Sequence, residues 1–123
     1  MKIMIVDDSS TIRTVITSTL KQLGAVTTET ACDGEDALSK VFSFEPDLIL
    51  LDWNMPKMSG LDFLKQFRSR NKATPVIMVT TEAEKSRVIE AIRAGINDYV
   101  VKPFTPDGLI SHVRTTLQKA KAA

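Results

Sequence analysis

Three short, continuous apolar runs constrain the fold of this chain more than any other feature of its sequence. They occupy residues 3–6, 48–51 and 75–79, and each is followed at once by a carboxylate or a hydroxyl group. Uninterrupted apolar runs of this length are typical of strands buried on both faces, as in a parallel sheet covered by helices. The runs therefore predict three central strands of such a sheet.

The segments between these runs carry apolar residues at helical spacing, which predicts buried positions for residues such as Val15, Ile89 and Ile92. Capping and stop signals predict helices that begin at Ser9 or Ser10, after Asp33, after Ser59, near Glu84 and after Thr105. Residues 26–31 and 99–101 predict two further strands, the first at an edge of the sheet because it is β-branched but polar. Five strand-then-helix units predict one α/β domain over residues 1–123, a doubly wound five-stranded parallel sheet with helices on both faces.

Composition excludes several classes of function. The 123 residues include 16 basic and 15 acidic side chains, so charge gives no indication of nucleic-acid or anionic-membrane binding. The sequence contains no apolar segment near the roughly 20 residues of a membrane helix and no signal-peptide pattern, which predicts a cytoplasmic location. Cys32 is the only cysteine and is expected to be a small packed side chain; the only histidine, His112, is expected on the surface.

Functional groups follow the predicted strands. Asp7 and Asp8 follow the first, Asp52 the third, Thr80 the fourth and Lys102 the fifth. A parallel sheet places all of these at one edge, where each pair of carboxylates 4 Å apart would repel by about 4 kcal/mol at an effective dielectric near 20. Lys102 can neutralise one charge and a divalent cation more. A site of oxygen ligands without histidine or cysteine favours Mg²⁺ over zinc.

A carboxylate, a hydroxyl, an ammonium and Mg²⁺ together suit phosphoryl transfer, in which catalysis consists mostly of positioning and of neutralising charge on the phosphoryl oxygens. Asp52 would be the nucleophile. The alternative is that these groups form buried ion pairs that serve only the fold. Unpaired acids at strand ends are costly to bury, which favours the functional interpretation.

At these residues the chain resembles the response-regulator receiver domains of bacterial two-component signalling, particularly those of chemotaxis. The similarity covers essentially the whole chain and includes the segment 52–60. It rests on the pair Asp7-Asp8, the acceptor Asp52, Pro56 and Gly60, the hydroxyl Thr80, the aromatic Tyr99, and Lys102-Pro103. The resemblance implies a flavodoxin-like strand order of 2-1-3-4-5.

The resemblance also implies a role for each residue of the acidic site. Asp8 and Asp52 would ligate Mg²⁺ together with the backbone carbonyl of Asn54, and Asp7 would act mainly through water. Asp52 would accept a phosphoryl group from a histidine kinase, and Thr80 and Lys102 would bind the phosphoryl oxygens. The Lys102-Pro103 peptide bond is expected to be cis.

Switching and hydrolysis are implied at neighbouring positions. Thr80 and Tyr99 would form the switch, with Tyr99 moving from an exposed to a buried rotamer after phosphorylation. Asn54 and Glu82 match residues that assist loss of the phosphoryl group in the chemotaxis members. Thr81 stands where the family usually has a smaller residue, and Ser59 replaces a frequent Asp or Asn. Thr81 could therefore restrict access to the acyl phosphate.

The implied protein is a signalling switch and not an enzyme in the usual sense, although it would assist its own phosphorylation and dephosphorylation. Its implied partners are a histidine kinase, a phosphatase, and a downstream protein such as the flagellar motor switch. That target would bind the surface made by residues 84–94, 99–101 and 105–118, and the protein is expected to be a monomer. A stand-alone regulator that acts by protein contact is favoured. The alternatives are a single-domain receiver of a phosphorelay and an excised receiver of a larger regulator.

Two other function classes share parts of this pattern. Phosphatases of the haloacid-dehalogenase type also use a strand-end Asp, Thr, Lys and Mg²⁺, but they need a second acid where this chain has Asn54. Flavin binding on the same fold class needs a loop that cradles phosphate after the first strand. The Asp7-Asp8 pair would repel that phosphate.

Overall fold

The apolar runs form the central strands of a single parallel sheet with the order β2-β1-β3-β4-β5, as predicted. The computed structural model describes residues 1–122. The strands are β1 (Lys2–Val6), β2 (Thr27–Ala31), β3 (Leu48–Leu51), β4 (Val76–Thr80) and β5 (Asp98–Val101). The helices are α1 (Ser10–Leu20), α2 (Gly34–Phe44), α3 (Gly60–Arg68), α4 (Lys85–Ala94) and α5 (Pro106–Ala122), with a 3₁₀ turn at Lys21–Leu23.

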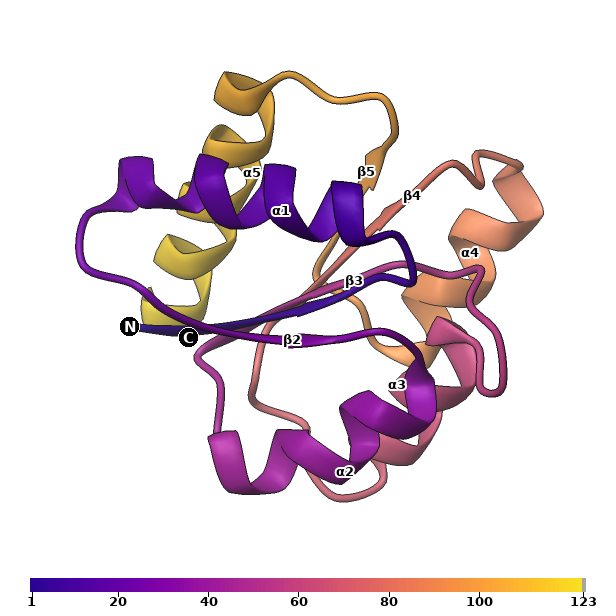
Figure 1. The fold of residues 1–123 in the computed structure, drawn as a ribbon. Coiled ribbons are helices and arrows are strands. Elements are labelled where there is room, and N and C mark those ends of the chain that lie inside the picture. Colours follow the sequence, from indigo (N-terminus) through magenta and orange to yellow (C-terminus); the bar gives the residue numbers. More distant parts are fainter. Residues whose placement is uncertain (123) are drawn as a thin grey trace.

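Helices cover both faces of the sheet, α1 and α5 on one face and α2, α3 and α4 on the other (Figure 1). Alternate residues of each central strand enter the two layers. Ile3 and Ile5 pack in the core under α1 and α5, while Met4 and Val6 pack in the core under α2 and α3. Because β1, β3 and β4 are buried on both faces, their sequences are continuously apolar, unlike the polar edge strand β2.

The predicted helix caps are present. Ser9, Asp33 and Ser59 each accept a hydrogen bond from the backbone amide three residues later, and the hydroxyl of Thr105 accepts one from the amide of Gly108. Ser9, and not Ser10, is therefore the cap of α1. These caps begin four of the five helices directly after the loops that follow strands.

Three sequence-based expectations about burial need correction. Cys32 is exposed, not packed, because it lies in the turn between β2 and α2. Val15 in α1 is exposed, although its spacing predicted a buried position. In α4 only Ala91 is buried, whereas Ile89 and Ile92 remain exposed, so this helix covers the sheet with a narrow apolar stripe.

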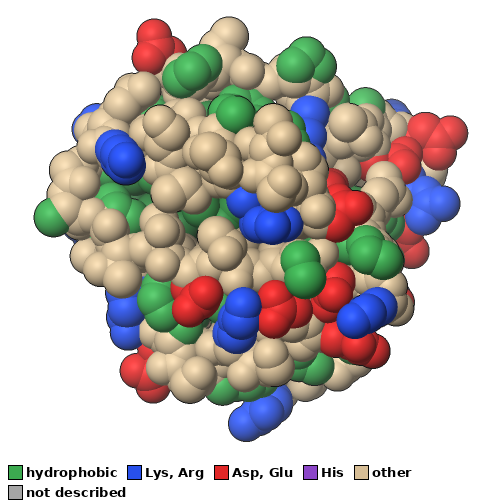
Figure 2. Space-filling view, in the orientation of Figure 1, with side chains coloured by type: hydrophobic (Ala, Val, Ile, Leu, Met, Phe, Trp, Pro, Cys, Tyr) green, Lys and Arg blue, Asp and Glu red, His purple; other side chains and the backbone are tan. Residues whose placement is uncertain are grey.

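His112 is exposed as predicted, and its Nδ1 lies 2.6 Å from Oδ2 of Asp98. Acidic and basic side chains are intermixed over the lower half of the face shown in Figure 2, in keeping with the balanced composition. Among residues 1–122, no helix combines the length and the apolar character needed to cross a membrane.

Candidate functional site

The functional groups predicted from the sequence meet at one edge of the sheet, beyond the carboxyl ends of the strands on the right of Figure 1. Val6, the last residue of β1, is paired with Leu51, the last residue of β3. Asp7 and Asp52, which directly follow these two strands, are therefore neighbours. Thr80 is paired with Val101, which places Lys102 beside the end of β4. Strand register alone thus brings these four residues together.

The acidic cluster consists of Asp7, Asp8 and Asp52. One carboxylate oxygen from each lies within 4.8 Å of the others. Asp7 and Asp52 are buried, while Asp8 is exposed and leaves the cluster open to solvent on one side. A set of converging carboxylate oxygens without nitrogen or sulfur donors fits a hard divalent cation such as Mg²⁺.

Lys102 supplies the internal positive charge. Its Nζ lies 2.6 Å from Oδ2 of Asp7 and 3.4 Å from Oδ2 of Asp52. The closer partner is therefore Asp7, and the looser contact leaves Asp52 the less engaged of the two buried acids. Removing one partner of an ion pair this buried strongly destabilises the fold, because the remaining charge stays in a poorly solvated environment.

The backbone fixes the position of Asp52. Its Oδ1 accepts a hydrogen bond of 2.7 Å from the amide of Trp53, and its own amide donates to the carbonyl of Val6. The amide of Gly60 donates to the carbonyl of Trp53, which brings the start of α3 against this loop. A Cβ atom on Gly60 would stand only 1.9 Å from the carbonyl oxygen of Asp52, so position 60 has space for glycine alone.

Thr80 and Tyr99 are linked through the peptide units of Glu82. The hydroxyl of Thr80, which is fully buried, accepts a hydrogen bond of 3.3 Å from the amide of Glu82. The hydroxyl of Tyr99 donates to the carbonyl of the same residue. Tyr99 is half-buried here and not fully exposed, and burial, followed by the charges of Glu82 and Asp52, raises the pKa of its phenol.

The side chains expected to influence hydrolysis lie at the solvent side of the site. Asn54 and Thr81 are exposed, and Glu82 is half-buried. The Lys102-Pro103 peptide bond is cis, as expected.

Two arginines near the site were not singled out from the sequence. Nη1 of Arg13 donates to the carbonyl of Asp7 at 2.7 Å, and the guanidinium of Arg87 lies 5.6 Å from the centre of the Trp53 ring. Arg13 is the only charged side chain of α1, and Arg87 is one of four in α4, but helical spacing does not show what either side chain contacts. Only the loop geometry shows that they reach the acidic site.

Comparison with known proteins agrees with this geometry. The family model described as the response regulator receiver domain matches residues 3–114. The chemotaxis protein CheY of Pseudomonas aeruginosa is 46% identical over 121 residues, which cover 97% of this chain and 98% of that protein. The chemotaxis protein CheY1 of Helicobacter pylori is 45% identical over 120 residues, covering 95% of this chain and 97% of that protein.

Solved structures show the same fold. A CheY-like response regulator receiver domain protein from Methanospirillum hungatei superposes with a TM-score of 0.92 at 26% identity, covering 98% of this chain and 96% of that one. The chemotaxis protein CheY4 of Vibrio cholerae gives a TM-score of 0.86 at 38% identity, covering 94% and 97%. With its strand order, its strand-end groups and a family match over most of its length, the chain belongs to the response regulator receiver domain family.

Proposed function

We propose that residues 1–123 act as one receiver domain, a phosphorylatable switch that takes a phosphoryl group on Asp52 from a histidine kinase. The observation that carries this proposal is the convergence of Asp52 with Asp7, Asp8 and Lys102 at one sheet edge. Asp52 has one oxygen held by a backbone amide and the other 3.4 Å from an ammonium. Such a carboxylate is oriented without being fully neutralised, which suits a nucleophile.

The acidic cluster would hold Mg²⁺ through Asp8, Asp52 and the backbone carbonyl of Asn54, with Asp7 contributing through water. When bound, the ion supplies positive charge for the phosphoryl oxygens. The exposed position of Asp8 supports entry of the ion from solvent. Removing one acid should leave too few ligands for binding at millimolar concentrations.

In the proposed transfer an oxygen of Asp52 attacks phosphorus, and the phosphorus–nitrogen bond of the kinase phosphohistidine breaks. The electron pair of that bond returns to the ring nitrogen, and the imidazole leaves as a neutral group because its other ring nitrogen carries a proton. Lys102 and the hydroxyl of Thr80 would bind the phosphoryl oxygens, since Lys102 lies 3.4 Å from Asp52 and Thr80 ends β4 beside β5, the strand that leads into Lys102. Incubation with acetyl phosphate and Mg²⁺, followed by borohydride trapping and peptide mass spectrometry, should place the label on Asp52.

The same groups would make the signal transient. Asn54 and Glu82 flank the site and would assist attack of water on the acyl phosphate, while the exposed Thr81 would restrict that access. A separate phosphatase would accelerate the loss. The protein would thus assist both its phosphorylation and its dephosphorylation without turning over an external substrate.

Output would pass to the surface of α4, β5 and α5. The exposed side chains of Ile92 and Val101 on these elements support binding of a protein target. The relatives named as chemotaxis proteins support a role in chemotaxis. In that role the protein would act in the cytoplasm as a monomer, with the flagellar motor switch as its target. A phosphorelay receiver is the second candidate, because the acceptor site would be the same.

Titration with Mg²⁺ should change the fluorescence of Trp53, which is the only tryptophan and donates its amide hydrogen bond to Asp52. In Asp8→Asn the midpoint should rise about tenfold or more, because one anionic ligand is lost. Asp47→Asn, which alters an acid at the opposite end of β3, should respond like wild type. An unchanged midpoint in Asp8→Asn would remove Asp8 from the ligand set.

Thr80→Ala should still accept phosphoryl but should lose about tenfold or more of the gain in target affinity that phosphorylation confers. Without the hydroxyl, the phosphoryl group cannot draw this segment inward, and the Tyr99 hydroxyl keeps its bond to Glu82. Affinity is measured by calorimetry with a peptide of the cognate target, and Thr14→Ala, at an exposed position of α1, serves as the control. Equal affinities for phosphorylated Thr80→Ala and wild type would separate Thr80 from the switch.

A further inference from the structure

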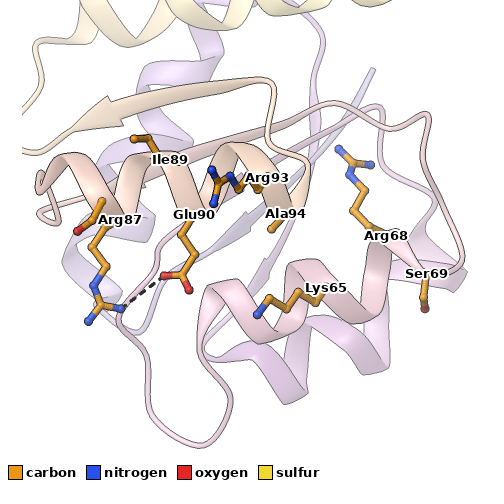
Figure 3. Close-up of a pocket in the computed structure, with 9 residues that line it drawn as sticks. Lys65, Arg68, Ser69, Arg87, Ile89, Glu90, Arg93 and Ala94 are labelled. Carbon is orange, nitrogen blue, oxygen red and sulfur yellow. Dashed lines mark ion pairs between the residues drawn. The ribbon is translucent and has the colours of Figure 1, made fainter.

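A groove lies between α3 and α4, and its α3 wall has no role in the proposed switch. Its volume is about 770 Å³, within the range of sites that bind small molecules or peptide side chains. The α3 wall includes Lys65 and Arg68, and the α4 wall includes Arg87, Glu90 and Arg93 (Figure 3). Ile89 and Ala94 add apolar surface to the lining.

The groove is basic although the chain is nearly neutral. Four of its lining residues are lysine or arginine and one is acidic, whereas the whole chain has 16 basic and 15 acidic residues. Lys65 and Arg93 are exposed, and within residues 1–122 neither forms an ion pair or a side-chain hydrogen bond. Both cations are therefore free to meet an anionic partner.

The other two basic residues have partners that fix them in place. Arg68 donates to the carbonyls of Gly95 and Asn71 and to the side chain of Asn97, which ties the end of α3 to the loop after α4. Burial lowers the pKa of its guanidinium. Arg87 pairs with Glu90 at 3.8 Å, and both side chains are nearly half exposed. Because such a surface ion pair is weak, a carboxylate of a partner could replace Glu90.

The cations are spread along the groove and do not converge on one point. Arg87 and Arg93 are separated by six residues of helix, or about 9 Å along the axis. A compact polyanion such as a triphosphate needs its cations around one centre. Carboxylates spaced along a chain, with an apolar side chain between them, match this arrangement better.

We propose that the groove between α3 and α4 docks an acidic segment of a protein partner, with Lys65 and Arg93 as its principal cations. This site is separate from the acceptor cluster, and it shares α4 but neither β5 nor α5 with the proposed output surface. One route connects it with the acceptor: Arg87 lies over Trp53, whose amide is bonded to Asp52. A segment that draws Arg87 away from Glu90 would alter the surroundings of Trp53.

The test uses the unphosphorylated full chain and a fluorescein-labelled peptide. Successive glutamates of the peptide are three or four residues apart, and two leucines stand between them. Anisotropy should show binding that weakens as salt is raised, since these are exposed charges. The Lys65→Glu and Arg93→Glu double variant should bind about tenfold or more weakly. The matched double variant Lys119→Glu and Lys121→Glu, which reverses two exposed charges on α5, should change affinity less than about twofold.

Other results would overturn the proposal. Equal losses in the two double variants would mean that only net charge matters, and equal binding of a glutamine-substituted peptide would exclude recognition of carboxylates. Tighter binding of ATP or of anionic lipid vesicles than of the peptide, lost in the groove variant, would assign the groove to a different occupant. Because no phosphoryl group is involved, any of these failures leaves the Asp52 chemistry untouched.

Discussion

Asp52→Asn should accept essentially no phosphoryl group, a fall of about a hundredfold or more in labelling by acetyl phosphate or by a phosphorylated kinase. An amide oxygen is a far weaker nucleophile than a carboxylate oxygen. No other acid is placed equivalently: Asp7 is held at 2.6 Å by Lys102, and Asp8 is turned to solvent. Quantitative mass spectrometry after borohydride trapping measures the effect.

The variant should nevertheless fold. Asparagine keeps the shape of Asp52 and an oxygen that can accept the bond from the Trp53 amide, and Lys102 keeps its closer partner, Asp7. Circular dichroism should therefore show a native spectrum. Asp47→Asn serves as the matched control, because Asp47 precedes the same strand at its other end, and it should label like wild type. Labelling of Asp52→Asn at the wild-type level would refute the assignment of the acceptor.

Gly60→Ala should destabilise the fold by about 3 kcal/mol or more, which corresponds to a fall in Tm of about 10 °C or more. The added methyl group would stand 1.9 Å from the carbonyl oxygen of Asp52 and 2.9 Å from its carbonyl carbon. These are backbone atoms, so no side chain can turn aside. Either the start of α3 or the loop after β3 must move, and urea denaturation should record the loss.

The same displacement should impair the acceptor site, because the Gly60 amide is bonded to the carbonyl of Trp53. Gln66→Ala, an exposed position later in α3, provides the control and should change stability by less than about 0.5 kcal/mol. If Gly60→Ala were as stable as this control, the close contact between α3 and the Asp52 loop would not exist in solution.

Much of the fold and the main site groups could be predicted because one pattern determines both. A strand buried on both faces must be apolar throughout, so its end is marked wherever a polar residue follows, as at Asp7, Asp52 and Thr80. Parallel pairing then brings these ends to one edge. Strand order came from the family resemblance, because periodicity contains no information on which strands are neighbours.

The structure was needed where side chains depend on distant neighbours. Spacing alone assigned Ile89 and Ile92 to a buried face, but α4 turns little of its surface toward the sheet and leaves them exposed. Cys32 looked like a packed residue until its turn was located. No residue pattern shows that the Lys102 ammonium lies closer to Asp7 than to Asp52. Nor does a pattern show that the hydroxyls of Thr80 and Tyr99 both bond to the backbone of Glu82.

The ion pair between Asp7 and Lys102 joins residues 95 positions apart in the chain. Contacts of such long separation form late, because the entropy of closing the intervening loop is lost before the contact contributes. During synthesis Asp7 and Asp52 leave the ribosome long before Lys102, the only ammonium that contacts them within residues 1–122. A nascent chain that ends before β5 would hold its buried acids without that charge, so the protein should become able to receive a signal only once nearly all of it has been made.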